Sequence, residues 1–193
     1  LLNLRPAPIL VTYHPETLSA NSVAKDFGEV LAALGVLSHP VVFTAPNADE
    51  GSSVIRRMTQ KFVLRHENAR FVESFGHHYY RMLASAAAML GNSSSGIIEA
   101  ATFHLPVVDV GDRQRGRLRG SNVINCPTDR HAIQRALSVA MSTQFRAKIA
   151  DSSNPYAPLR SRPSRIVVRA LKDWRTRQNL LNKRFISLQN YKK

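Results

Sequence analysis

The sequence predicts an α/β domain in which a parallel sheet is covered by helices on both faces. Two observations lead to this prediction. Short apolar runs alternate with helical patterns along the chain, and hydrophobic residues make up 44% of it, enough for a substantial core. Strand–helix alternation places successive strands in parallel, with helices packed on both sides. Right-handed crossovers then produce a doubly wound, Rossmann-like domain.

The individual elements follow one another at the spacing expected of such a domain. Strands are predicted at residues 8–13, 41–44, 70–72, 88–90, 106–110 and 122–124. Apolar residues three and four positions apart predict helices at residues 22–37, 53–65, 79–87, 95–103, 130–141 and 165–181. Residues 46–51 and 152–164 are predicted to be loops, the second one leading to the terminal helix.

The chain of 193 residues has the length of one ordinary domain with an extension. Residues 1–156 are expected to form the Rossmann-like domain. Residues 157–193 are expected to form a basic loop and a helix, which pack on the same domain or reach a missing N-terminal domain. Because the sequence begins at Leu1 rather than at Met, we expect it to be part of a longer protein.

The charge is strongly basic, with 27 Lys and Arg against 13 Asp and Glu, giving +14. Such a balance is typical of proteins that bind nucleic acid, a membrane surface or a phosphorylated substrate. Basic residues concentrate at 113–119 and 160–193, and a solvated surface would also explain the second concentration. No nucleic-acid motif or aromatic platform accompanies them, so a nucleic-acid-binding module is the weaker alternative.

The remaining composition argues against several other classes of protein. No apolar run approaches the roughly 20 residues that span a bilayer, so no membrane association is expected. Cys126 is the single cysteine and cannot form an internal disulfide, which favours a reducing cytoplasm. It follows an apolar run and is expected to be buried rather than catalytic. The seven histidines lack the spacing of metal ligands, so no metal site is predicted.

Ligands of open parallel sheets bind beyond the carboxyl ends of the strands, which directs the functional search to the loops after residues 13, 44, 90 and 110. The most informative stretch is Gly91–Ala100, where a strand leads through small residues into a helix. Hydroxyl and free N–H groups at such a helix start suit an anion, which places phosphate near Ser93, Ser94 and Ser95. Glu99, one turn further, could accept hydrogen bonds from ribose hydroxyls. An ordinary serine cap is the alternative interpretation.

Three other loops contribute candidate residues to the same edge. Residues 111–117 contain two glycines and three arginines, which predicts a mobile cationic loop for a diphosphate, or otherwise an exposed basic turn. His14 ends the first strand and could bond to phosphate or move a proton, although a lone histidine is more often structural. Residues 46–49, which include Asn47, could line the same cleft, although Asn and Asp are also common turn formers.

In this order and spacing, the motifs from about residue 8 to 156 closely resemble those of UDP-N-acetylglucosamine 2-epimerases. The resemblance is carried by His14-Pro15, Pro46-Asn47-Ala48-Asp49-Glu50-Gly51, Gly91-Asn92-Ser93-Ser94-Ser95-Gly96-Ile97-Ile98-Glu99-Ala100, Leu105-Pro106-Val107-Val108, Gly111-Asp112-Arg113-Gln114-Arg115-Gly116-Arg117, Gly120-Ser121-Asn122-Val123-Ile124 and, weakly, Asn154-Pro155-Tyr156.

The resemblance implies the second domain of a GT-B-type enzyme, in which two Rossmann-like domains face each other across a cleft that holds UDP-N-acetylglucosamine or UDP. It assigns His14 to the diphosphate with a catalytic role, Ser93 and Ser94 to phosphate, Glu99 to the ribose, Arg113 to the charged end of the substrate, and Asn47 to the same neighbourhood. It also implies that the principal acid and base carboxylates lie in the missing first domain, that no cofactor or metal is needed, and that the enzyme is a homo-oligomer.

The Ser-Ser-Ser-Gly and His-Pro forms resemble the hydrolysing enzymes of sialic acid and cell-surface polysaccharide pathways. These release UDP by elimination, and water then adds to give N-acetylmannosamine. Because the principal acid and base carboxylates are expected in the missing first domain, we expect this chain alone to bind UDP weakly without turning over substrate. A UDP-sugar-dependent glycosyltransferase of the GT-B type is the alternative within the same architecture.

Overall fold

The computed structural model describes residues 5–16, 22–157 and 162–174. Contacts between residues divide the chain into two compact units, Leu1–Tyr156 and Ala157–Lys193. The first unit is built around a sheet of six strands, and the described part of the second unit contains one helix.

The sheet is parallel throughout the described residues and runs in the order β3-β2-β1-β4-β5-β6. Its strands are β1 (Ile9–Thr12), β2 (Val41–Thr44), β3 (Ala69–Val72), β4 (Ala88–Gly91), β5 (Val107–Val110) and β6 (Val123–Cys126). The predicted α/β class with a parallel sheet is confirmed. Strand order reverses between β1 and β4, which is where ligands bind in sheets of this topology.

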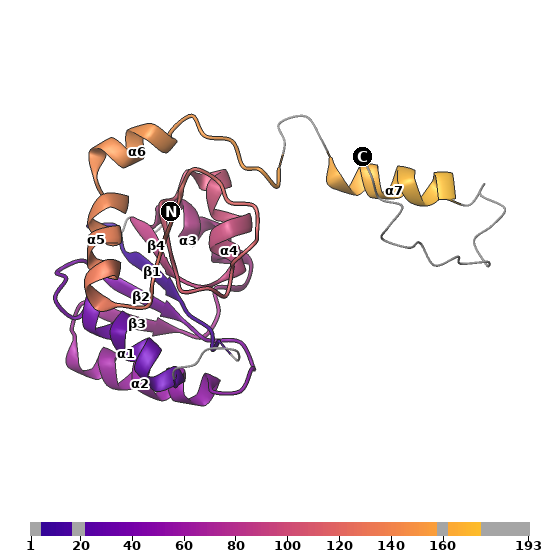
Figure 1. The fold of residues 1–193 in the computed structure, drawn as a ribbon. Helices are drawn as coiled ribbons and strands as arrows, with labels where there is room; N and C mark the ends of the chain where they lie inside the picture. Colours follow the sequence, from indigo (N-terminus) through magenta and orange to yellow (C-terminus); the bar gives the residue numbers. More distant parts are fainter. Residues whose placement is uncertain (1–4, 17–21, 158–161, 175–193) are drawn as a thin grey trace, which may run out of the picture. The chain divides into compact units, whose positions relative to one another are not determined.

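Helices cover both faces of the sheet, as Figure 1 shows. The bounds are α1 (Val23–Leu34), α2 (Ser52–Arg65), η1 (Gly76–His78), α3 (Tyr79–Ser85), α4 (Ser94–Ile98), η2 (Ala100–Phe103), α5 (Arg130–Ala140) and α6 (Thr143–Ile149). One core joins α1, α2 and α5 to strand residues such as Ile9 and Val11. The other joins α3 and η2 to Leu10 and Met89. Neighbouring residues of a strand thus face opposite cores, because side chains alternate along a strand.

Two elements differ from the prediction. The single helix expected at 95–103 is divided into α4 and the 3₁₀ helix η2, with Glu99 as the junction residue. Helix ends often tighten into 3₁₀ turns, and apolar spacing does not reveal this. Helix α6 was not predicted, because Ile149 is its only fully buried residue and no apolar stripe marks it. Cys126 is buried at the end of β6, as expected.

Strands β1 and β4 approach each other closely at their carboxyl ends. Gly91 pairs with Thr12 and has a φ of 138°, a value that side-chain-bearing residues rarely adopt. A Cβ atom at Gly91 would lie 2.0 Å from the carbonyl oxygen of Thr12. Glycine is therefore required here for the two strand ends to meet.

In the second unit, α7 (Pro163–Trp174) is an exposed amphipathic helix. Ile166, Val167 and Leu171 are more than half exposed on its apolar side, while Arg165 and Lys172 belong to its basic side. The expected helix extended to residue 181, and residues 175–181 lie outside the described part of the chain. Within the described residues, no helix is both long and apolar enough to cross a membrane.

Candidate functional site

The loops that follow β1, β2, β4 and β5 lie at one edge of the sheet, because all strands point the same way. Hydrogen bonds tie these loops together around Asn92, which is fully buried. The N–H of His14 donates to Asn92 Oδ1 at 2.7 Å, and Asn92 Nδ2 donates to the carbonyl of His14 at 2.9 Å. The carbonyl of Asn92 accepts from Gln114 Nε2 at 2.8 Å and from Arg113 Nη1 at 3.1 Å.

His14 is held in one tautomer by its neighbour after β2. The backbone N–H of Asn47 donates to His14 Nδ1 at 3.0 Å, so the ring proton of the neutral imidazole resides on Nε2. Burial, reinforced by the Arg113 guanidinium and opposed by Asp49, lowers the pKa of His14 from 6.5 to about 4. At neutral pH the ring is therefore uncharged and offers Nε2–H as a hydrogen-bond donor.

The serine-rich segment begins α4. Ser93 is its N-cap and accepts from the N–H of Ser95, and Ser94 is its first residue. The hydroxyls of Ser95 and Tyr79 are 2.6 Å apart. Because α4 has only five residues, its dipole is weak. Burial raises the pKa of Tyr79, and the nearby Glu99 carboxylate adds to this.

Two side-chain oxygens of the predicted site are buried with no hydrogen-bond partner among the described residues. They are Asn47 Oδ1 and Glu99 Oε2. The amide nitrogen of Asn47 donates to Asp49, so only its oxygen is unsatisfied. Buried acceptors of this kind are rare in folded proteins and carry a desolvation penalty. A ligand with hydroxyl or N–H donors would remove that penalty.

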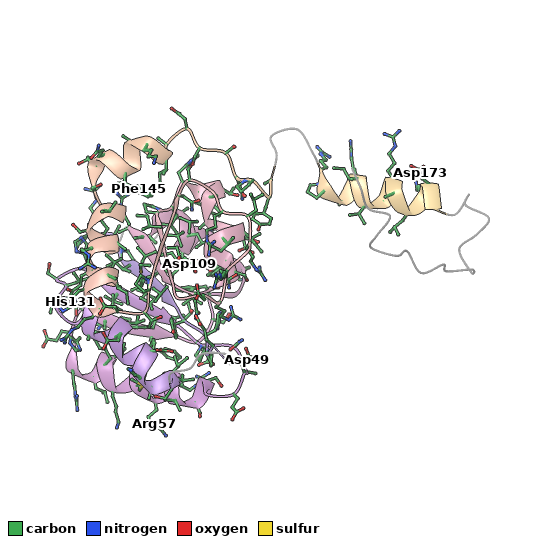
Figure 2. The ribbon with its side chains drawn as sticks, viewed as in Figure 1. Asp49, Arg57, Asp109, His131, Phe145 and Asp173 are labelled. Carbon is green, nitrogen blue, oxygen red and sulfur yellow. The ribbon has the colours of Figure 1, made fainter. Side chains whose placement is uncertain are left out.

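The arginine-containing loop after β5, which we expected to be mobile, is anchored at several points. The N–H of Arg113 donates to Glu16 Oε1 at 3.2 Å. At the far end of the loop, Arg119 Nη2 lies 2.9 Å from Asp109 Oδ2 and also donates to the carbonyl of Gln114 at 3.2 Å. Asp109, which Figure 2 labels, is buried on β5. Burial raises the pKa of Asp109, although Arg119 opposes that effect.

The arginines of this loop therefore differ in role. Arg113 donates to the carbonyl of Asn92, and its charge acts on His14. Arg115 and Arg117 are exposed, and Arg119 is a structural partner of Asp109. Of the predicted site residues, His14, Asn47 and Arg113 form one connected cluster through Asn92. Ser93 and Ser94 follow Asn92 in the chain, and Glu99 lies one helical turn beyond them with Tyr79.

Sequence reasoning did not assign separate roles to Asn92, Tyr79 and Glu16. Asn92 directly follows the strand-ending Gly91, and its position in the loop was the only signal available. The contact between Tyr79 and Ser95 joins α3 to α4, and that between Glu16 and Arg113 spans 97 positions of the chain. Such contacts arise only when the chain is folded.

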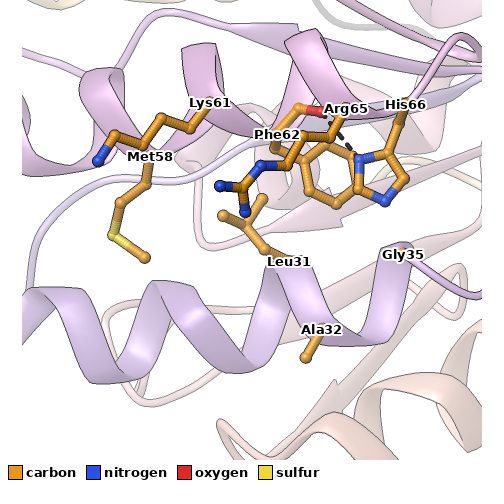
Figure 3. A pocket seen from close by; sticks show the side chains of 8 residues that line it. All are labelled: Leu31, Ala32, Gly35, Met58, Lys61, Phe62, Arg65 and His66. Atoms are coloured by element: carbon orange, nitrogen blue, oxygen red, sulfur yellow. Dashed lines mark hydrogen bonds between the residues drawn. The ribbon is translucent and has the colours of Figure 1, made fainter.

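A separate groove of about 390 Å³ lies between α1 and α2 (Figure 3). It is lined by apolar side chains such as Leu31 and Met58, with Lys61 and Arg65 beside them. His66 Nδ1 donates to the carbonyl of Phe62 at 2.8 Å, and the two rings stack 3.8 Å apart. The groove includes the last residues of α2, which precede β3, so it extends toward the edge opposite the predicted site. Among the described residues, no group of three His, Cys, Asp or Glu could hold a metal ion.

Comparison with known proteins agrees with this arrangement. Residues 4–171 match the family model described as UDP-N-acetylglucosamine 2-epimerase. The polysialic acid biosynthesis protein P7 of Escherichia coli is 35% identical over 149 residues, covering 76% of this chain and 38% of the relative. GDP/UDP-N,N'-diacetylbacillosamine 2-epimerase (hydrolyzing) of Campylobacter jejuni is 38% identical over 119 residues, covering 60% of this chain and 31% of the relative. The chain thus spans about a third of the length of these curated relatives.

Solved structures share the fold at low sequence identity. S. aureus MnaA, solved with UDP, superposes with a TM-score of 0.67 at 16% identity, covering 93% of this chain and 48% of that one. The UDP-GlcNAc 2-epimerase of Neisseria meningitidis, bound to UDP-GlcNAc, gives a TM-score of 0.62 at 16% identity, covering 86% and 44%. The fold thus corresponds to about half of a GT-B-like epimerase. Together with the family match over most of its length, this shows that the chain belongs to the UDP-N-acetylglucosamine 2-epimerase family.

Proposed function

We propose that this chain is the UDP-binding half of a hydrolysing UDP-N-acetylglucosamine 2-epimerase, with UDP at the carboxyl edge of the sheet. One observation carries the proposal. A neutral histidine donor and an arginine converge on a serine-rich loop at the switch point of the sheet, held together by Asn92. Donors arranged in this way favour an anionic group.

The diphosphate is the part of UDP that this cluster suits. Nε2–H of His14 donates one hydrogen bond, and Arg113 supplies positive charge. The hydroxyls of Ser93 and Ser94 supply further donors, since each hydroxyl can donate one hydrogen bond. Such groups stabilise a leaving diphosphate, because its negative charge increases as the bond to the sugar breaks.

The ribose belongs, in this proposal, beside Glu99. Its buried and unpartnered Oε2 can accept a hydrogen bond from a ribose hydroxyl. The equally unpartnered Oδ1 of Asn47 can accept a bond from another ligand hydroxyl or N–H. Both contacts would satisfy acceptors that are otherwise buried without a partner.

The proposed reaction begins when the bond between C1 of the sugar and the diphosphate oxygen breaks, and the bonding electron pair leaves with UDP. A base removes the proton from C2, which gives a glycal. Water then adds across the double bond to form N-acetylmannosamine. The base and acid would come from the part of the enzyme outside this chain, and the reaction requires no cofactor or metal. The hydrolysing branch is supported by relatives named as hydrolysing epimerases in Campylobacter jejuni and Legionella pneumophila.

Calorimetric titration with UDP tests the nucleotide site, and a product assay with UDP-N-acetylglucosamine tests turnover. We expect the parent chain to bind UDP more tightly than GDP or ADP. In the product assay we expect no N-acetylmannosamine to form. Arg135→Ala, which removes an exposed arginine from α5, controls for loss of charge at a distance and should bind UDP like the parent. Equal affinity of the parent chain for all three nucleotides would contradict a specific UDP site. Weaker UDP binding by Arg135→Ala than by the parent chain would contradict it as well. Formation of N-acetylmannosamine would contradict the need for a second half.

A further inference from the structure

The side chain of Asn92 is not among the predicted ligand-binding groups, yet it joins the ends of β1 and β4 at the switch point. Its amide makes a two-point contact with the backbone of His14, accepting at 2.7 Å and donating at 2.9 Å. These bonds continue the pairing of β1 with β4 beyond the last paired residues, Thr12 and Gly91. The amide therefore acts like one further rung of the sheet.

We infer that Asn92 is a positioning residue. Its side-chain amide fixes the His14 imidazole so that Nε2–H points to the place proposed for the anionic ligand. The backbone of His14 has no regular strand partner at this point, and the two bonds from Asn92 determine its direction. That direction brings Nδ1 to the N–H of Asn47 at 3.0 Å. The backbone carbonyl of Asn92 accepts from Arg113 Nη1 at 3.1 Å, so Asn92 contacts both His14 and Arg113, the two donors proposed for the anionic ligand.

Because Asn92 is buried, water cannot readily replace its amide as the hydrogen-bond partner of the His14 backbone. Asn92 has no exposed surface, and its amide and carbonyl serve loops that lie 78 and 21 positions away in the sequence. Removing a buried amide leaves the N–H and carbonyl of His14 without partners, and they can recover only by moving toward water. The imidazole would move with them, away from Asn47 and Arg113.

The inference rests on the proposed function for its consequence, but its central claim concerns His14 and can be measured without a nucleotide. NMR of the imidazole nitrogens in the full chain gives the tautomer and the pKa of His14. In Asn92→Ala we expect the pKa to rise from about 4 toward 6.5 and the Nε2–H tautomer to lose its predominance. We also expect UDP affinity to fall about tenfold or more, as for loss of a hydrogen bond to a charged group.

Asn68→Ala is the matched control. The side-chain amide of Asn68 likewise makes two hydrogen bonds to backbone, because Nδ2 donates to the carbonyls of Leu37 and His39, but these lie at the opposite edge of the sheet. It should lose stability while leaving the tautomer and pKa of His14 and the affinity for UDP unchanged. If both variants change His14 alike, the effect is general destabilisation and the positioning role is refuted. An unchanged His14 in folded Asn92→Ala refutes it as well.

Two further outcomes remain decisive. If the parent chain binds no UDP, the proposed function fails, while the His14 measurement still decides the role of Asn92. If Asn92→Ala does not fold, hydrogen exchange in the parent chain replaces it. The backbone N–H of His14 and the side-chain amide of Asn92 should then exchange slowly, and exchange as fast as in an exposed loop would overturn the inference.

Discussion

Replacing His14 with Asn tests whether the histidine is buried in its neutral form. An Asn side chain places an oxygen where Nδ1 stands in His14, so it can still accept from the N–H of Asn47. The same change removes Nε2–H and the titration of the ring. Parent and variant should therefore differ mainly in how their stability depends on pH.

The direction of this difference follows from the pKa of His14. Its value in the folded chain, about 4, lies below the ordinary 6.5, so the unfolded chain binds the proton more tightly. The resulting stability is present above pH 6.5 and is lost as the pH falls from there toward 4. The difference of 2.5 between the two values corresponds to about 3.4 kcal/mol at 1.36 kcal/mol per pKa unit. Because His14 is partly exposed, solvent screening reduces the expected effect to about 2 kcal/mol.

Urea unfolding of both proteins at about pH 7.5 and about pH 4.5 measures this quantity. Carboxylates contribute to both curves, so the relevant value is the difference between parent and variant in the change of unfolding free energy. We expect the parent to lose about 1.5 to 2 kcal/mol more than His14→Asn. Parallel pH dependences would show that His14 is not held neutral by burial. The claim that burial keeps the His14 imidazole uncharged beside the diphosphate would then be refuted.

Three other substitutions separate the parts of the site. Arg113→Ala should weaken UDP about tenfold or more in calorimetry and leave uridine, which has no phosphate, almost unaffected; equal loss for both ligands would contradict its place at the diphosphate. Glu99→Gln should weaken uridine and UDP by similar factors, and an unchanged affinity for uridine would remove the carboxylate from the ribose. Gly91→Ala should reduce the unfolding free energy by about 3 kcal/mol or prevent folding, because its Cβ would collide with Thr12. Gly116→Ala is the control, with φ at 81° and open space around it, and should cost only about 1 kcal/mol in the same urea unfolding assay.

The elements that could be predicted from the sequence are those marked by a pattern of neighbouring residues. Ile9–Thr12 and Val107–Val110 are short runs of consecutive buried residues, and such runs identify strands that are covered on both faces. Helix α5 was predictable because Ile133, Ala136, Leu137 and Ala140 recur at helical spacing. The carboxyl-end rule then directed attention to the loops that carry the candidate residues.

Elements without a repeating pattern could not be found in this way. Helix α6 has a single fully buried residue, Ile149, and is defined by its cap, in which Ser142 accepts from the N–H of Phe145. The division at Glu99 depends on backbone angles within the turn, to which apolar spacing is insensitive. The roles of the arginines also required the fold, because Arg119 pairs with Asp109, a buried carboxylate that only the packed sheet provides.

The sequence by itself determined the alternation of strands and helices and the set of polar residues at strand ends, because both are patterns of neighbouring residues. It also determined the basic charge, which depends on composition alone. Only the tertiary structure decided the order of the strands, the tautomer of His14 and the place of Asn92. These depend on contacts between residues far apart in the chain, such as the 78 positions between His14 and Asn92. The physical reason is that a buried hydrogen bond forms only where packing brings a donor and an acceptor together and excludes water.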